Sequence, residues 1–269
     1  MKIATILFTY DRSKHTRKVI EALAVNTKKP EKLFVFQDAA EAGDDLAEWE
    51  KVKEIITDIT WCDTEVHIAD KKKGCSRSII DGIDYVLQEY EAVIVLEDDC
   101  VPHPQFLSYM DQALRKYKNF PKVYSVGGYA WDVDLPLSQM DAYFNGRTSS
   151  WGWGTWRDRW AQFQEDYRIV RKIKKTEEGK ERLSLWGADL ENMVIGNVTG
   201  ACDAWDVFWS LTVIKNDGVC LSPYDSLILN IGMDGSGTHC GVRKDEGKNF
   251  KKKYQTSFAL PEEIKISRE

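Results

Sequence analysis

Three consecutive acidic residues, Glu97, Asp98 and Asp99, directly follow a run of five apolar residues at positions 92–96. Three of these five residues are Val or Ile, which is typical of a strand buried on both faces in a parallel sheet. Adjacent carboxylates repel one another and are costly to desolvate, so a bound cation would stabilise them. Hard oxygen ligands beside phosphates suit Mg²⁺ or Mn²⁺. Taken alone, the triplet fits a solvated acidic turn equally well.

A second set of polar residues follows two earlier apolar runs. Thr9, Asp11 and Arg12 come after residues 3–8, and Asp38 comes after residues 33–37. A carboxylate there can accept hydrogen bonds from a uracil N–H or a ribose hydroxyl, and an arginine donates paired hydrogen bonds to a phosphate. Each residue alone also fits ordinary turn chemistry. The chain contains neither a G-x-G-x-x-G nor a P-loop motif.

The elements that must position these residues alternate along the first half of the chain. Apolar patterns predict strands at 3–8, 33–37, 65–69, 92–96 and 123–126, with helices at 13–25, 48–59, 76–87 and 106–117. Such alternation predicts an α/β fold with a mostly parallel central sheet flanked by helices. Ligands of these sheets bind beyond the carboxyl ends of the strands, which would bring the loops 9–12, 37–38 and 97–99 together.

The second half of the chain has weaker periodicity. We expect helices at 156–167 and 204–213, and a charged, solvated stretch at 171–182. The predicted organisation is one domain with a nucleotide-sugar-binding half (1–130), an acceptor-binding and catalytic half (131–242) and a charged tail (243–269). We expect the tail to be solvated, and peripheral contact with an anionic membrane surface is the alternative.

Composition excludes several classes of protein. The chain has 269 residues, 43% hydrophobic and 30% charged, as in an ordinary globular domain. Its net charge of −6 gives no reason to expect nucleic acid as a partner, and no apolar run is long enough to span a bilayer. The six cysteines form no CxxC pair and no signal peptide is apparent, so we expect a cytoplasmic protein with free thiols.

Four segments, in order along the chain, resemble blocks of the GT-A-fold glycosyltransferases. They are residues 4–12, 33–38, 93–99 and 104–107, and they are most similar to the N-acetylglucosaminyltransferase I type, with kinship to bacterial family 2 enzymes. The resemblance covers roughly residues 3–130. It implies the GT-A fold and a metal-dependent, inverting transfer from a nucleotide diphosphate sugar, foremost a UDP-sugar. The acceptor would be a saccharide or glycolipid, as in bacterial surface polysaccharide synthesis.

The same resemblance implies roles for the residues at the strand ends. Asp99 would ligate the Mn²⁺ or Mg²⁺ ion, whereas Glu97 and Asp98 would contact the ribose and the donor sugar. Arg12 and Asp38 would hold the nucleotide. The segment 73–77, which includes Ser76, would complete the nucleotide pocket, although the lysines at 71–73 also fit a solvated turn. A metal ion there would act as a Lewis acid that stabilises the departing diphosphate.

An inverting transfer also needs a base that takes the proton from the attacking hydroxyl. Asp206 follows Trp205 and matches the Trp-Asp pair that carries the base in the resembling family. Asp203 is the alternative base, because Val207 stands where the family often has a second acid. Asp203 could instead cap the helix expected at 204–213.

Two glycine-containing segments complete the predicted site. Residues 149–156 resemble the family's donor-sugar region, so Trp151, Gly152 and Trp153 would line the sugar pocket. Glycine lets the backbone approach a ligand, and tryptophan faces stack on sugars, but a tightly packed aromatic core is the alternative. The segment 230–239 ends in His239, which would contact the phosphate or the metal if the segment closes over the diphosphate. A lone histidine in a loop also fits an ordinary surface residue.

Two other functions remain open at this point. A sugar-phosphate nucleotidyltransferase would share the first half of the fold, but it needs a glycine-rich loop after the first strand, where this chain has Thr9-Tyr10-Asp11-Arg12. A non-catalytic saccharide- or nucleotide-binding protein of the same fold is the second alternative, because a fold by itself does not establish turnover.

Overall fold

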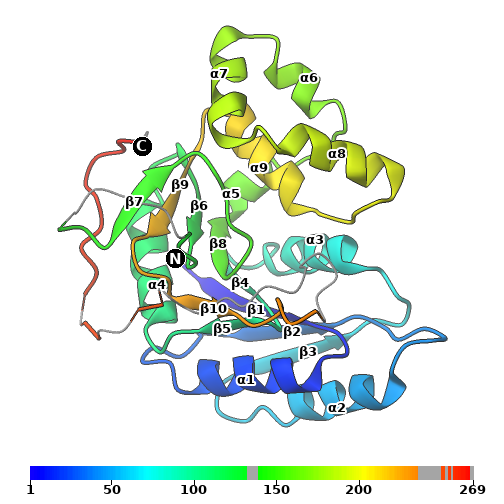
Figure 1. Cartoon of the computed structure of the whole chain (residues 1–269). Helices are drawn as coiled ribbons and strands as arrows, with labels where there is room; N and C mark the ends of the chain where they lie inside the picture. Colours follow the sequence, from blue (N-terminus) through cyan, green and yellow to red (C-terminus); the bar gives the residue numbers. More distant parts are fainter. Residues whose placement is uncertain (132–138, 236–249, 252–253, 256, 267–269) are drawn as a thin grey trace.

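Strands from both halves of the chain build one large sheet (Figure 1). The computed structural model describes residues 1–131, 139–235, 250–251, 254–255 and 257–266. Its strands are β1 (Ile3–Thr9), β2 (Leu33–Gln37), β3 (Thr64–Ile68), β4 (Ala92–Glu97), β5 (Cys100–Pro102), β6 (Val123–Gly127), β7 (Ala142–Asn145), β8 (Trp153–Trp156), β9 (Val219–Pro223) and β10 (Ile228–Asn230). The large sheet has the order β3-β2-β1-β4-β8-β6-β9-β7, and β5 pairs separately with β10.

The first four strands are parallel neighbours and lie within one residue of their predicted bounds. Side chains of β1 alternate between two cores, with Ile3 and Leu7 in one and Ala4, Ile6 and Phe8 in the other. A strand covered on both faces needs an unbroken apolar run, which is why the sequence pattern located it so well. The predicted α/β class with a mostly parallel sheet is confirmed.

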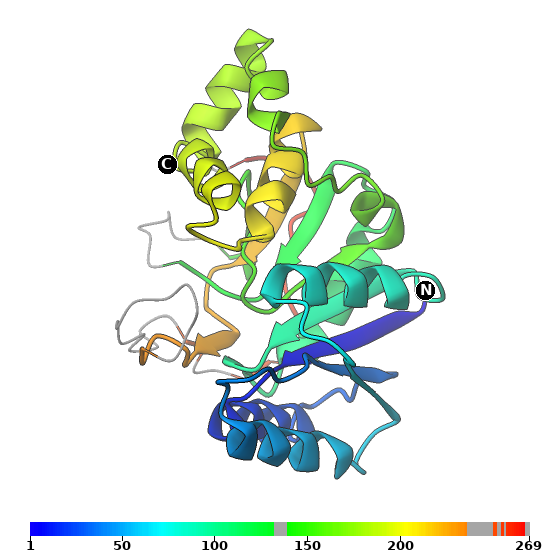
Figure 2. The same ribbon diagram turned by 90° about the vertical axis from the view of Figure 1, so that its right-hand side faces the viewer.

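Helices cover both faces of the parallel strands (Figure 2). On one face lie α1 (Ser13–Ala24), α2 (Leu46–Thr57) and α4 (Phe106–Tyr117), whose buried residues include Leu23, Ile56 and Met110. On the other face lies α3 (Cys75–Val86), which packs through Ile79 and Ile83. All four helices occupy the segments in which the apolar period predicts them.

Beyond β4 the sheet is mixed and includes antiparallel strand pairs. Strand β8 runs antiparallel between β4 and β6, and β7 runs antiparallel to β9. The helix predicted at 156–167 is wrong beyond Trp160, where the short α5 (Arg157–Trp160) ends. Asp166 opens a new turn, because its carboxylate accepts a hydrogen bond from the backbone nitrogen of Arg168 at 2.9 Å. Local side-chain bonds of this kind compete with helix continuation.

Four helices gather at one end of the molecule, away from α1 and α2 (Figures 1 and 2). They are α6 (Ile169–Ile173), α7 (Glu177–Trp186), α8 (Leu190–Thr199) and α9 (Asp206–Lys215). They enclose a core of their own that contains Ile173, Leu183 and Phe208. The prediction that 171–182 is a charged, solvated stretch is confirmed for its charged residues, nearly all of which are exposed, although Ile173 within it belongs to this core.

The described residues of the C-terminal segment pack against the large sheet and α4. Phe258 and Leu260 belong to the main core. Lys251 is only 6% exposed and lies within 4 Å of Asp141 and Asp225. The prediction of a solvated tail is therefore wrong for these three residues, whereas Tyr254 and Glu262 are exposed as predicted. Residues 243–249 lie outside the described residues.

Two expectations from composition can be compared with the described part of the chain. No helix there is long and apolar enough to cross a membrane. The cysteines in that part are free thiols, as expected, and they are Cys62, Cys75, Cys100, Cys202 and Cys220.

Candidate active site

Three loops meet at the carboxyl edge of the parallel strands. The register of β1 pairs Thr9 with Gln37 and Phe8 with Glu97, so the residues that follow β1, β2 and β4 start side by side. Thr9 Oγ1 also donates a hydrogen bond to the carbonyl oxygen of Phe36 at 3.2 Å. The prediction that these loops share one edge of the sheet is confirmed.

Arg12 bridges two acids of the triplet. Its Nη2 donates to Asp98 Oδ1 and, at 3.0 Å, to Asp99 Oδ2, while its Nε donates to Asp98 Oδ2 at 3.4 Å. Burial raises the pKa of Asp98 to about 6, because desolvation outweighs the attraction of Arg12. Burial lowers the pKa of Arg12, but the charges of Asp98 and Asp99 reverse that effect and raise it, so the guanidinium stays charged.

Glu97 differs from its two neighbours. It is partly buried at the end of β4, and no described residue donates a hydrogen bond to its carboxylate. Burial first, and then the charges of Asp99, Asp98 and Asp206, raise the pKa of Glu97 well above its usual range. Acids with raised pKa values gather at functional sites more often than at structural ion pairs.

The chemistry of Asp98 and Asp99 fits a divalent cation. The Arg12 guanidinium shows that a positive group can contact both carboxylates at once. No cluster of three or more His, Cys, Asp or Glu residues suited to a metal ion occurs among the residues that the structure describes. Mg²⁺ usually takes one or two carboxylates and completes its shell with water and substrate phosphates, so a smaller set suffices. His239, the other expected ligand, lies outside the described residues.

The Asp38 carboxylate accepts backbone N–H groups. Its Oδ1 accepts from the nitrogens of Ala39 and Lys73, and its Oδ2 accepts from the nitrogen of Gly74, all at 2.9 Å. These bonds anchor the loop before α3 to the end of β2. The contact that the sequence predicts between Asp38 and a nucleotide stays a prediction.

Lys72 links two loops at this edge, which the sequence did not indicate. Its Nζ donates to the Tyr10 hydroxyl at 2.6 Å and to Asp44 Oδ2 at 2.9 Å. Burial is the main cause that raises the pKa of Tyr10 to about 12, whereas the hydrogen bond from Tyr10 is the main cause that lowers the pKa of Asp44 to about 2. Asp11, next to Tyr10, is partly buried, and burial raises its pKa.

Asp203 caps a helix that is distant in sequence. Its Oδ2 accepts a hydrogen bond from the backbone nitrogen of Ser76, in the first turn of α3, at 3.2 Å. A carboxylate at a helix N-terminus is stabilised by the helix dipole. The expectation that Asp203 caps the following helix is wrong, because α9 begins only at Asp206. The Ser76 hydroxyl is buried without a hydrogen-bond partner in the described part of the chain.

Asp206 faces the acid triplet from the second half of the chain. It lies in the first turn of α9, and its charge contributes to the raised pKa of Glu97. Ser150 Oγ donates a hydrogen bond to Asp206 Oδ2 at 3.5 Å. The two acids that the sequence offers as a base thus have different surroundings, since Asp203 caps α3 and Asp206 accepts a hydrogen bond from Ser150.

Trp153 is a core residue. It is 0% exposed in β8 and packs against Trp160, Trp205 and Trp209, with its ring centroid 5.2 Å from that of Trp205. The alternative of a tightly packed aromatic core therefore holds for Trp153, whose fully buried ring presents no face to a sugar in this structure.

Trp151 lies at the surface beside two other aromatic rings. Its ring centroid is 4.6 Å from that of Tyr129 and 5.3 Å from that of Trp131, which is 46% exposed. Gly152 has a φ of 61°, and a Cβ added there would lie 2.4 Å from Ile228. The turn and this close packing explain the glycine without a ligand.

A segment that follows β10 covers Asp99. The Ile231 nitrogen donates to the Asp99 carbonyl oxygen at 2.9 Å, and a Cβ added to Gly232 would lie 2.2 Å from Asp99 Oδ2. His15 Nε2 lies 3.3 Å from the Ile231 carbonyl oxygen and 3.1 Å from Asp234 Oδ2. Gly232 belongs to the segment 230–239 that the sequence places at the site, whereas sequence reasoning missed His15, because nothing in its local pattern indicates these distant contacts.

No protein-family model and no curated protein sequence matches this chain. Among solved structures, the S. aureus protein TarS is similar over 85% of this chain and 36% of its own, at 12% identity and a TM-score of 0.47. The mannosyltransferase PcManGT from Pyrobaculum calidifontis, in complex with GDP-Man and Mn²⁺, is similar over 80% of this chain and 69% of its own, at 9% identity and a TM-score of 0.44.

A third similar structure is glucosyl-3-phosphoglycerate synthase from Mycobacterium tuberculosis, in complex with Mn²⁺, UDP and glucosyl-3-phosphoglycerate. It covers 58% of this chain and 57% of its own, at 11% identity and a TM-score of 0.36. The chain thus spans little more than a third of TarS. At these identities and TM-scores the likeness assigns neither a family nor an activity to this chain.

Proposed function

We propose that this chain is a metal-dependent, inverting glycosyltransferase of the GT-A type. It would move a sugar from a nucleotide diphosphate donor, foremost a UDP-sugar, to a hydroxyl of a saccharide acceptor. One observation carries the proposal: Asp98 and Asp99 contact Arg12 at the carboxyl edge of parallel strands, with Asp206 nearby on α9. Ligands of parallel α/β sheets bind at this edge.

The donor side of the proposed site combines negative and positive groups. Asp99 would hold the divalent cation, and Arg12 would pair with the diphosphate, whose oxygens suit the planar guanidinium. When bound, the cation supplies Lewis-acid stabilisation of the charge that develops on the leaving diphosphate. Glu97 would face the donor sugar, and Asp38 would hold the nucleotide through the loop that it anchors.

The acceptor side depends on Asp206. An acid that faces the triplet from a separate helix can take the proton from an attacking hydroxyl on the side opposite the leaving group. The hydrogen bond from Ser150 orients the Asp206 carboxylate. Asp203 would position this segment through its bond to α3 rather than act as the base.

The test is transfer and hydrolysis of a panel of UDP-sugars with Mn²⁺, measured for the wild type, Asp99→Ala, Asp206→Ala and Asp203→Ala. We expect Asp99→Ala and Asp206→Ala to lose about 100-fold or more of the rate. Asp203→Ala should lose less. Asp58→Ala changes an exposed acid at the end of α2 and is the matched control.

Three outcomes would contradict the proposal. Full activity of both Asp99→Ala and Asp206→Ala would remove the two acids from the mechanism. Release of pyrophosphate from a nucleoside triphosphate and a sugar phosphate would indicate a nucleotidyltransferase. Tight UDP binding without turnover of any donor and acceptor would indicate a binding protein of the same fold.

A further inference from the structure

Arg12 is the cation that contacts the acid triplet directly. A single guanidinium makes three hydrogen bonds to Asp98 and Asp99, as described above. Its side chain is 19% exposed, while those of Asp98 and Asp99 are 5% and 13% exposed. Within the described residues no other lysine, arginine or histidine forms an ion pair with either acid. The protein therefore carries its own positive charge where carboxylates would meet a metal ion.

Asp99 Oδ2 is enclosed on two sides. Arg12 Nη2 lies 3.0 Å from it, and the Gly232 backbone packs so closely that an added Cβ would lie 2.2 Å away. The other oxygen, Oδ1, accepts a hydrogen bond from the Cys100 thiol at 3.4 Å. A cation that binds Asp99 must therefore compete with the hydrogen bond from Arg12.

Arg12 also has a donor that the present arrangement leaves unused. Its Nη1 is buried and has no hydrogen-bond partner in the described part of the chain. A buried donor without a hydrogen-bond partner destabilises the folded state. An arginine that served only to neutralise Asp98 and Asp99 would gain nothing from that arrangement. A planar guanidinium with a free nitrogen is, however, well suited to phosphate oxygens.

We propose that Arg12 is a placeholder for the divalent cation at Asp98 and Asp99. In the metal-free protein it neutralises these two acids, and it transfers its hydrogen bonds to the donor diphosphate when a divalent cation binds Asp99. This inference rests on the proposed function. The movement of Arg12 would make the binding of cation and nucleotide cooperative, because each ligand favours the position of Arg12 in which the other can bind.

The test measures Mn²⁺ affinity without nucleotide, from the free-ion signal in electron paramagnetic resonance. Arg12→Met keeps the length of the side chain but removes the charge, so we expect Mn²⁺ to bind about 10-fold more tightly than to the wild type. UDP should strengthen Mn²⁺ binding in both proteins, because its phosphates can ligate the ion directly, but the factor should be about 10-fold larger in the wild type than in this variant. Arg17→Met, on an exposed position of the same helix, is the matched control.

Thermal unfolding supplies a second readout. Removing Arg12 leaves two buried carboxylates without a cation, so the midpoint of Arg12→Met should fall without metal and rise more with Mn²⁺ than that of the wild type. If Arg12→Met does not fold, Arg12→Lys carries the same test, because an ammonium group is a compact point charge without the planar fork that contacts both carboxylates. We expect Arg12→Lys to bind Mn²⁺ more tightly than the wild type by a smaller factor.

Unchanged or weaker Mn²⁺ binding in a folded Arg12 variant would overturn the placeholder role. Failure of the proposed function has a different signature, since the wild type would then transfer and hydrolyse no UDP-sugar, whatever the Mn²⁺ affinity of the Arg12 variants. A factor of cooperativity between UDP and Mn²⁺ that is as large in Arg12→Met as in the wild type would also overturn the placeholder role, while leaving the glycosyltransferase proposal intact.

Discussion

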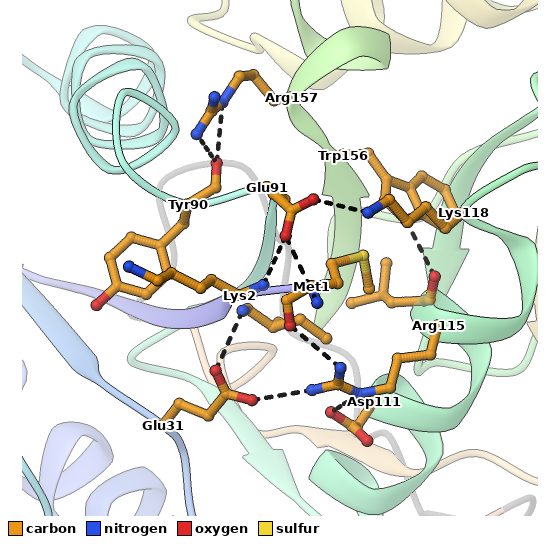
Figure 3. A network of polar contacts seen from close by, with 12 residues as sticks. Met1, Lys2, Glu31, Tyr90, Glu91, Asp111, Arg115, Lys118, Trp156 and Arg157 are labelled. Atoms are coloured by element: carbon orange, nitrogen blue, oxygen red, sulfur yellow. Dashed lines mark hydrogen bonds and ion pairs between the residues drawn. The ribbon is translucent and has the colours of Figure 1, made fainter.

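A glutamate stands at each end of strand β4, and the pKa values of the two carboxyl groups are shifted in opposite directions. Glu91 precedes the strand and accepts hydrogen bonds from Lys118 Nζ at 2.7 Å and from the backbone nitrogen of Lys2 at 2.9 Å (Figure 3). The bond from Lys118 is the main cause that lowers the pKa of Glu91 to about 2. Glu97 ends the strand without a hydrogen bond from the described residues, and burial raises its pKa.

Two arginines repeat this contrast. At the amino end, Arg115 donates from Nε to Asp111, from Nη1 to the Met1 carbonyl oxygen and from Nη2 to Glu31, at 2.9, 3.1 and 2.9 Å (Figure 3). At the carboxyl end, Arg12 leaves its Nη1 without a partner. Polar groups at a purely structural edge find partners, and exceptions in a native fold point to function. The amino end therefore has the contacts of a structural edge, whereas the carboxyl end is where the proposed function places the donor.

The largest expected effect is a loss of cation binding and activity on substitution at the carboxyl end of β4 but not at its amino end. Asp99→Asn removes a charge that the proposed cation needs, so the rise in unfolding midpoint caused by Mn²⁺ with UDP should disappear and transfer should fall about 100-fold or more. Asp111→Asn removes the acid that lies 2.9 Å from Arg115 and should leave both quantities unchanged. Equal losses in the two variants would abolish the distinction.

Opposite changes in stability are expected when the two glutamates become glutamines. Glu97→Gln replaces a partly buried carboxylate without a partner, so the midpoint of thermal unfolding at neutral pH should rise by about 2 °C or more. Glu91→Gln removes the charged partner of Lys118, so the midpoint should fall slightly. Calorimetry of both variants without ligands measures whether each midpoint rises or falls relative to the wild type. A fall in Glu97→Gln would show that Glu97 stabilises the fold.

Lowering the pH should remove the contribution of Glu91 to the stability of the folded protein. Its pKa is lowered from 4.5 to about 2 in the folded protein, so its stabilising effect is complete above about 4.5 and is lost as the pH falls toward 2. The measurement is the difference in unfolding midpoint between the wild type and Glu91→Gln from neutral pH down to about 2. A difference that persists at the lowest pH would contradict the role of the ion pair.

The smallest expected effect concerns salt. Arg115 and Glu31 are 40% and 42% exposed, so their coupling should be about 0.2–1 kcal/mol and should vanish at about 1 M salt. Arg12 and Asp98 are 19% and 5% exposed, so their coupling should persist. Double-mutant cycles at low and high salt measure both couplings. Equal salt sensitivity would mean that the carboxyl end is as open to solvent as the amino end.

The residues that sequence reasoning misjudged share a physical feature. Trp153, Asp203 and Lys251 each obtain their surroundings from segments far away in the chain. The same holds for Ile173, which the core among α6, α7 and α9 buries although the charged residues around it are exposed, as predicted. Composition reports what a segment contains, whereas burial depends on what packs against it.

The sequence by itself determined the parallel strands, the helices that flank them and the acids at the end of β4. Apolar period and strand length are local properties, and the right-handed crossover then brings the strand ends to one edge. Only the tertiary structure decided which charges meet there. Arg12 and Asp98 are 86 residues apart, and Asp203 and Ser76 are 127 apart. Contacts at such separations depend on how whole layers pack, and no local pattern encodes them.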